Sequence, residues 1–188
     1  MTLTDELAAI YARRGAEAYF GEAVTMMEHG LQAAYFAAAH RASDALIIAA
    51  LLHDVGHLIV PAPDDIADWK TDAEHERTGA DWLAKRFGPQ VSEPVRLHVP
   101  AKRYLCATDP GYFKRLSEAS VLTLQLQGGP MSPAEVATFE SQSYWRDAVL
   151  LRQWDDQGKI RALQTPGFDS YAPMIERLAQ GSPRAMGA

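Results

Sequence analysis

Apolar residues recur every three or four positions along most of the chain, and no stretch alternates between apolar and polar residues over the length of a strand. This pattern predicts an all-α protein. Glycine, proline and capping residues indicate where the helices begin and end. The predicted helices cover residues 3–14, 22–40, 44–59, 74–87, 91–98, 110–119, 120–127, a segment starting at 133, 143–156 and 169–178.

The helix predicted over residues 44–59 is apolar on nearly every side, since its central part reads ALIIAALL at 45–52. A helix without a polar face is typical of the buried centre of a bundle. Ser43 is a good capping residue for its N-terminus, and Pro61 should end it.

Proline and capping signals set three further boundaries. Pro100 is expected to stop the helix over 91–98, because proline inside a helix removes a hydrogen bond and clashes with the preceding turn. Ser132 followed by Glu135 is the sequence of a capping box and predicts a helix start. The acidic stretch at 62–72 has no helical period and is expected to be a loop.

The composition supports one globular domain. The chain has 188 residues, of which 47% are hydrophobic and 22% are charged, as in ordinary folded proteins. We therefore expect a single domain over 1–188. Its core should lie at about 19–157, and the termini 1–18 and 158–188 should pack against the core or fray.

Charge and cysteine content exclude several classes of protein. With 24 acidic and 18 basic residues the formal net charge is −6, the opposite of the balance usual in nucleic-acid-binding proteins. The longest apolar run, 45–52, is far shorter than the roughly 20 residues that cross a membrane, and the N-terminus has no apolar signal segment. The single cysteine, Cys106, favours a reducing, cytoplasmic compartment. We expect no nucleic-acid partner and no membrane association.

The candidate chemistry centres on histidine and aspartate. The pair His53-Asp54 stands near the end of the most apolar predicted helix, where burying both groups is costly unless they are hydrogen-bonded or bind a metal. His57 lies four residues further on, on the same face of that predicted helix. A lone pair of this kind is more often hydrogen-bonded than metal-bound, so it does not decide the function.

Three more histidines favour a metal. His29 lies in the preceding predicted helix, and His75 and His98 lie in the two that follow, so four helices each supply an imidazole. Imidazole and carboxylate without thiolate suit iron, manganese or zinc and argue against a structural zinc site. The candidates for a further carboxylate ligand are Asp147, Asp155 and Asp156, of which Asp155 alone follows an Arg-x-Trp sequence.

Four segments, together with these residues, carry a resemblance to a known family. They read YFGEA at 19–23, ALLHDVGH at 50–57, HVPAKRYL at 98–105 and LQGGPM at 126–131. The chain resembles the HD-domain superfamily and, within it, the mixed-valent di-iron oxygenases that cleave carbon–phosphorus bonds. The resemblance implies a single HD-domain helical bundle with a buried dinuclear metal site.

The resemblance also implies a ligand set for two iron ions, Fe2+ and Fe3+, in which Asp54 bridges the metals. The implied ligands are His29, His53, Asp54, His75, His98 and Asp155. Lys102 and Arg152 lie four and three residues from such ligands and can neutralise a phosphonate. Ser120 matches a serine that contacts the phosphonate in that family. The competing interpretations are solvated surface cations and a small packing serine.

Tyr19, Glu22 and His57 are the candidates for catalytic roles. In the resembling family the tyrosine and glutamate close the site, the tyrosine occupies an iron position until substrate displaces it, and the glutamate faces the amine end of the substrate. Here Tyr19 could instead pack in the core, and Glu22 could favour a helix N-terminus. His57 would face the substrate or support a ligand.

The expected function is oxidation of a 1-hydroxyalkylphosphonate, such as 2-amino-1-hydroxyethylphosphonate, by O2 to a carboxylic acid and phosphate. The head group stays open: a trimethylammonium analogue would use Glu22 or an aromatic wall from Tyr19, Phe20 and Tyr104, and hydroxymethylphosphonate has no head group. Two other functions remain, a metal-dependent phosphohydrolase of a nucleotide or phosphate ester and a non-catalytic ligand-binding module.

Overall fold

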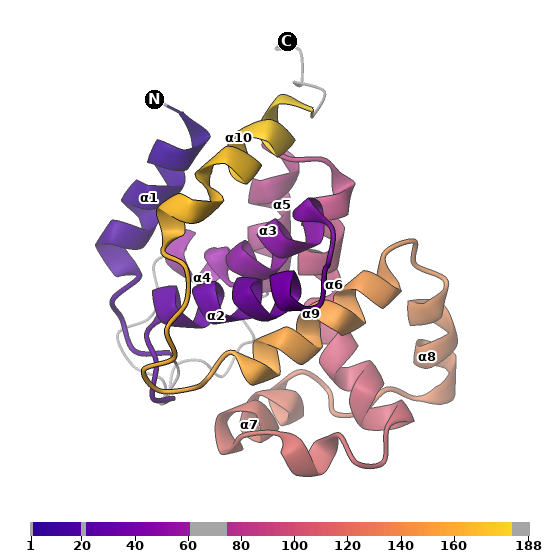
Figure 1. Cartoon of the computed structure of the whole chain (residues 1–188). Helices are drawn as coiled ribbons and strands as arrows, with labels where there is room; N and C mark the ends of the chain where they lie inside the picture. The colour runs from indigo at the N-terminus through magenta and orange to yellow at the C-terminus, as the bar shows by residue number, and fades with distance from the viewer. Residues whose placement is uncertain (1, 20–21, 61–74, 182–188) are drawn as a thin grey trace.

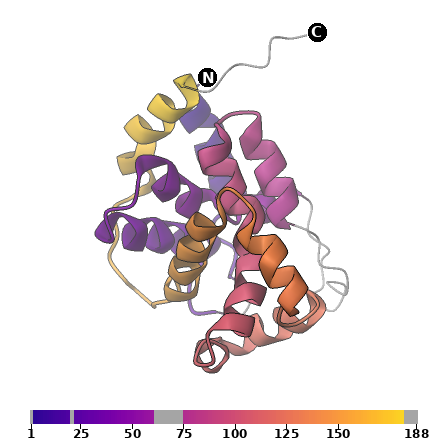
Figure 2. The same cartoon turned by 90° about the vertical axis from the view of Figure 1, so that its right-hand side faces the viewer.

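The computed structural model describes residues 2–19, 22–60 and 75–181, and over these ranges the regular structure is helical, with no β-strand (Figures 1 and 2). The prediction of an all-α fold is confirmed. The elements in chain order are α1 Leu3–Arg14, α2 Met26–Ala39, α3 Asp44–Leu52, α4 Val55–Ile59, α5 His75–Ala84, α6 Pro89–Thr108, the 3-10 helix η2 Phe113–Arg115, α7 Glu118–Leu126, α8 Pro133–Glu140, α9 Trp145–Gln157, the 3-10 helix η3 Phe168–Tyr171 and α10 Ala172–Gln180.

The apolar helix α3 lies at the centre of the bundle, as predicted. Its residues from Ala45 to Leu52 are all buried, and it contacts α2, α6, α9 and α10. The Ser43 hydroxyl accepts a hydrogen bond from the backbone N–H of Leu46 at 3.3 Å and caps the helix. His53, which follows the C-terminal end of α3, therefore lies in the interior.

The prediction of one continuous helix over 44–59 is wrong, because α3 ends at Leu52 and α4 begins at Val55, with His53 and Asp54 between them. Asp54 has φ −98° and ψ 12°, and its side chain caps no N–H of α4. Since α3 and α4 are separate helices, His53 and His57 do not share one helix face. The break leaves the Asp54 carboxylate available to side chains from other helices.

Helix α6 continues through Pro100, where the sequence predicted a stop. A proline inside a helix costs about 3 kcal/mol, and α6 contains both Pro94 and Pro100. Burial of α6 against α3, α5 and α9 outweighs this local cost. As a result His98 and Lys102 lie one turn apart on a continuous helix and face the same cavity.

Other predicted boundaries shift by a few residues. The helix predicted from residue 22 begins at Met26. Ser132 and Glu135 form the predicted capping box at the start of α8. Residues 110–127, predicted as two helices, contain η2 and α7. The predicted loop at 62–72 lies outside the described residues.

The first and last helices lie side by side at one end of the bundle (Figure 1). Leu7 and Tyr11 from α1 and Ile175 from α10 belong to the same hydrophobic cluster as α3. Helices α1 and α10 thus add to the hydrophobic cluster that contains α3.

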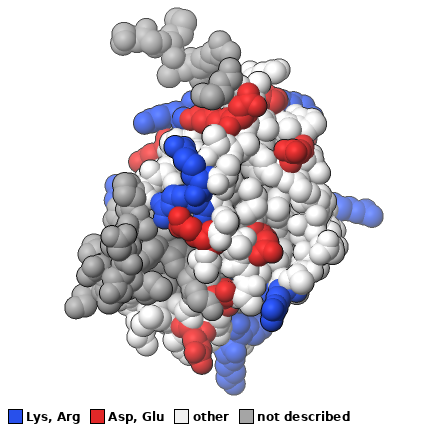
Figure 3. All heavy atoms as spheres, turned by 90° about the vertical axis from the view of Figure 1, so that its left-hand side faces the viewer, with Lys and Arg blue, Asp and Glu red and all other residues white. Residues whose placement is uncertain are grey.

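No helix in the described ranges is long and apolar enough to cross a membrane. On the face shown in Figure 3, the described basic side chains are interspersed with acidic ones rather than gathered in a broad patch.

Candidate metal centre and active site

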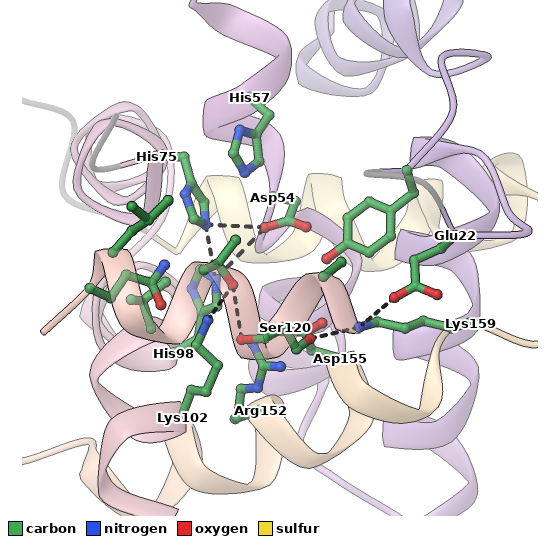
Figure 4. Close-up of a pocket in the computed structure, with 16 residues that line it drawn as sticks. Glu22, Asp54, His57, His75, His98, Lys102, Ser120, Arg152, Asp155 and Lys159 are labelled. Atoms are coloured by element: carbon green, nitrogen blue, oxygen red, sulfur yellow. Dashed lines mark hydrogen bonds and ion pairs between the residues drawn. The ribbon is translucent and has the colours of Figure 1, made fainter. Parts of the chain in front are cut away.

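Four histidines from different helices meet in the interior as two pairs. His29 on α2 and His53 after α3 bring their Nε2 atoms to 3.1 Å. His75 at the start of α5 and His98 on α6 bring their Nε2 atoms to 3.3 Å (Figure 4). The pairs are neighbours, because the rings of His53 and His98 lie 5.3 Å apart.

Backbone carbonyl groups orient three of these rings. The contacts from Nδ1 to the carbonyl oxygens are His29 to Gly158 at 2.9 Å, His53 to Ala50 at 2.8 Å and His98 to Val95 at 2.7 Å. A carbonyl only accepts hydrogen bonds, so Nδ1 of each ring carries a hydrogen and Nε2 is the atom turned toward the other histidines. Ligand histidines of metal sites are held in this way, with Nε2 left to bind the metal.

The Asp54 carboxylate lies between the two histidine pairs. Its Oδ2 is 3.3 Å from His53 Nε2 and 3.6 Å from His29 Nε2. Its Oδ1 is 3.5 Å from His75 Nε2 and 3.7 Å from His98 Nε2. Each oxygen therefore faces one pair, which is the geometry required of a carboxylate that bridges two metal ions.

Asp155 adds a second carboxylate to the first pair. Its Oδ1 is 3.4 Å from His29 Nε2, and its Oδ2 forms an ion pair with Arg152 Nη1 at 2.7 Å. Asp156 pairs with Arg152 from the other side, and Asp147 does not line the cavity. Among the three carboxylates considered from the sequence, Asp155 is thus the one that faces the histidines.

The buried oxygen atoms of this cluster fit a metal cofactor. Within the described residues, Asp54 Oδ2 and Asp155 Oδ1 are buried and have no hydrogen-bond partner. Leaving a carboxylate oxygen buried in this state is costly, and a bound cation removes the cost. The donor atoms are imidazole nitrogen and carboxylate oxygen, which suit iron, manganese or zinc. The groups His29–His53–Asp54 and Asp54–His75–His98 are each compact enough to hold one ion.

We predict that metal binding releases about one proton. Burial disfavours a charge on His53, but Asp54 and Asp155 outweigh burial and raise its pKa to about 9 without metal. His53 is therefore protonated at pH 7.5, and a metal must displace that proton. Calorimetric titration with Mn2+ in buffers of different ionisation enthalpy should show this release, and the release should vanish as the pH rises above about 9. A heat of binding independent of the buffer at pH 7.5 would contradict the prediction.

A cavity lies against the cluster (Figure 4), and every predicted site residue except the fully buried His29 and His53 lines it. Tyr19 stacks on His29 with ring centres 3.8 Å apart. Burial and then the charge of Asp54 hold the pKa of the Tyr19 phenol well above its usual range, so it stays protonated. His57 stacks on His75 at 3.9 Å, and burial lowers the pKa of His57 to about 4, so it is neutral.

Two lysines and two hydroxyl groups line the side of the cavity formed by α7. Lys102 Nζ donates a hydrogen bond to Thr123 Oγ1 at 2.8 Å. Lys159 Nζ lies 3.1 Å from Ser120 Oγ and 3.3 Å from Glu22 Oε1. Cationic nitrogen and hydroxyl groups together are suited to an anion with several oxygen atoms.

Sequence reasoning missed three of the polar residues that line the cavity, Thr123, Gln127 and Lys159. Thr123 and Gln127 follow Ser120 by three and seven residues, so the helical period would have placed them on its face. Lys159 gives no such signal, because it follows the end of α9 at Gly158.

Two residues near His98 in the sequence lie away from the cavity. Tyr104, considered as an aromatic wall, donates a hydrogen bond to Glu140 at 2.8 Å and does not line the cavity. Arg103 bonds the backbone oxygen of Gly129 and the Glu135 carboxylate, as expected for a structural residue. Phe20 lies outside the described residues.

The chain is similar to proteins of a known family. The HD domain family matches residues 26–127. The [1-hydroxy-2-(trimethylamino)ethyl]phosphonate dioxygenase (glycine-betaine-forming) of Leisingera caerulea is 43% identical over 94% of this chain and 90% of its own. The hydroxymethylphosphonate dioxygenase of Gimesia maris is also 43% identical, over 88% and 83%. An uncharacterised protein of Acanthamoeba polyphaga mimivirus is 36% identical over 92% and 80%. The resemblance carried by the four sequence segments is confirmed, and the chain belongs to the HD-domain phosphonate dioxygenase family.

Proposed function

We propose that this protein is a di-iron oxygenase that uses O2 to cleave the carbon–phosphorus bond of a 1-hydroxyalkylphosphonate. The substrate R–CH(OH)–PO3H2 and O2 would give R–COOH and H3PO4, which balances all atoms. The observation that carries the proposal is the pair of donor sets sharing Asp54 beside a cavity with buried cations.

The metal ions would be held by the predicted ligands. One set comprises His29, His53, Asp54 and Asp155, and the other comprises Asp54, His75 and His98. We assign iron because the reaction is a redox reaction with O2, which zinc cannot support. Bound iron would supply electron transfer and the open positions at which substrate and O2 meet.

The residues of the cavity would bind the phosphonate. Lys102 and Arg152 are both almost fully buried and would neutralise the dianion, while Ser120 would donate a hydrogen bond. Thr123 and Lys159 also line the cavity and would bind the same oxygen atoms. These groups would hold the hydroxylated carbon toward the ligands.

Tyr19 and His57 are proposed to control the metal-facing side of the cavity. Tyr19 is protonated and packed on the ligand His29, so it can give way to substrate without leaving a charge behind. His57 is neutral and packed on the ligand His75, so its imidazole nitrogens could accept or donate a hydrogen bond at the substrate hydroxyl.

The substrates in the names of the two dioxygenase relatives differ in their head group. Glu22 faces the cavity and forms an ion pair with Lys159. A cationic head group would share Glu22 with Lys159, whereas a substrate without a head group would leave the ion pair intact. We therefore keep three candidates: 2-amino-1-hydroxyethylphosphonate, its trimethylammonium analogue and hydroxymethylphosphonate.

Phosphate release tests the proposal. Iron-loaded, ascorbate-reduced protein is incubated with each candidate with and without O2. Release only with O2, together with glycine, glycine betaine or formate, supports the oxygenase and identifies the head group. Phosphate release from phosphate esters without O2 would support the hydrolase alternative instead, and no release from any compound would contradict both.

We predict that Lys102→Met weakens phosphonate binding while the protein still folds. Removing a buried cation from an anion site costs at least about 2 kcal/mol, or about a 30-fold rise in KM. Lys85→Met is the matched control, because Lys85 is exposed on the surface. An unchanged KM in Lys102→Met would remove this lysine from the phosphonate site.

We further propose that residues 1–188 form one HD domain, since both terminal helices add to the core around the site. The partners would be a small organophosphonate and O2, with no nucleic acid and no membrane. The single cysteine supports a cytoplasmic location.

A further inference from the structure

Arg152 is held by three acidic or phenolic groups rather than by one. Its Nη1 forms an ion pair with Asp155 Oδ2 at 2.7 Å, its Nη2 donates a hydrogen bond to Asp156 Oδ1, and its Nε donates a hydrogen bond to the Tyr112 hydroxyl at 3.1 Å. The Tyr112 hydroxyl in turn donates to Asp156 Oδ2. All three nitrogens of the guanidinium are therefore engaged, on a side chain that is only 5% exposed.

Three members of this network, Arg152, Tyr112 and Asp156, form a closed ring of hydrogen bonds. Tyr112 comes from the segment between α6 and η2, while Arg152 and Asp156 lie one turn apart on α9. The phenol both accepts from Arg152 and donates to Asp156, so it fixes the plane of the guanidinium. Burial raises the pKa of Tyr112, which keeps the phenol protonated and able to donate.

The orientation of Arg152 decides which oxygen of Asp155 faces the histidines. Arg152 Nη1 forms its ion pair with Oδ2, which leaves Oδ1 facing the histidines, and Oδ1 is the buried oxygen without a hydrogen-bond partner. A carboxylate restrained in this way binds a metal through one oxygen and leaves a neighbouring position open. If Arg152 turned away, both oxygens of Asp155 would be available to the metal.

We propose that Tyr112 and Asp156 are positioning residues that hold Arg152 so that Asp155 binds the metal of the His29–His53 pair through Oδ1 alone. The inference rests on the metal centre of the proposed function, but not on its substrate or on O2. The same restraint fixes the remaining N–H groups of Arg152, which lines the cavity.

The experiment compares Tyr112→Phe and Asp156→Asn with the matched control Tyr104→Phe. The control also removes one hydrogen bond from a phenol to a carboxylate, that of Tyr104 to Glu140, away from the cavity. Binding of Mn2+ at both positions is measured by chelator competition, and the di-iron form is examined by electron paramagnetic resonance. Circular dichroism and thermal unfolding report whether each variant folds.

We expect Tyr112→Phe and Asp156→Asn to fold, and to weaken one of the two Mn2+ sites by about 10- to 100-fold while the other changes less than about threefold. The resonance signal of the mixed-valent iron should shift in both variants and not in Tyr104→Phe. Unchanged affinities and spectra in both folded variants would overturn the proposal, as would equal weakening of both sites. If only one of the two variants folds, its Mn2+ affinities alone test the proposal. Failure of O2-dependent phosphate release would contradict the proposed function and leave these affinities measurable.

Discussion

Replacing Asp54 with alanine is expected to abolish metal binding at both positions and to reduce turnover to background. Each oxygen of this carboxylate faces a different histidine pair, and Asp54 is the residue shared by the two described groups that could each hold a metal ion. Without Asp54, the remaining site aspartate, Asp155, lies beside His29 and His53. Neither site aspartate is then left beside His75 and His98.

Metal content after loading with iron, together with phosphate release, measures this effect. Asp147→Ala is the control, because Asp147 is a half-buried acid in the first turn of α9 that does not line the cavity. It should lose only the few tenths of a kcal/mol that an acid gives at a helix N-terminus. Near-normal activity, or two tightly bound metal ions, in a folded Asp54→Ala variant would refute the bridging role.

The interior of the bundle was predictable because its signals are local and strong. The apolar run of α3, the cap at Ser43 and the capping box at Ser132 each agree with the packing that the fold imposes. That His29 and Asp155 belong to one ligand set was implied only by the family resemblance, since residues 126 positions apart give no local signal that they meet.

The errors arose where tertiary contacts override local preference. The break at His53 and Asp54 interrupts the most apolar segment of the chain, because the Asp54 carboxylate contacts histidines of other helices. Pro100 stays inside α6 because three packed helices outweigh its intrinsic cost. Lys159 was missed because its position depends on how the chain turns after Gly158, whose carbonyl oxygen also orients His29.

Gly56→Ala should destabilise the protein by about 3 kcal/mol and disrupt the site around His75. A Cβ at Gly56 would lie 2.0 Å from the backbone oxygen of His75 and 3.0 Å from the backbone nitrogen of Gly79. Neither contact can be relieved by turning a side chain, so α4 and α5 must move apart. This movement would shift His75 away from His98, which it faces across 3.3 Å.

Urea unfolding of the metal-free protein measures the loss of stability, and metal titration shows whether the position bound by His75 and His98 is weakened more than the other. Gly167→Ala is the control, because a Cβ at Gly167 meets nothing within 4 Å and its φ of −71° suits any residue. That variant should unfold at the same or a slightly higher urea concentration. Equal stability of the two variants would show that α4 and α5 adjust without strain, and the close approach of their backbones would then not be what fixes His75 in the site.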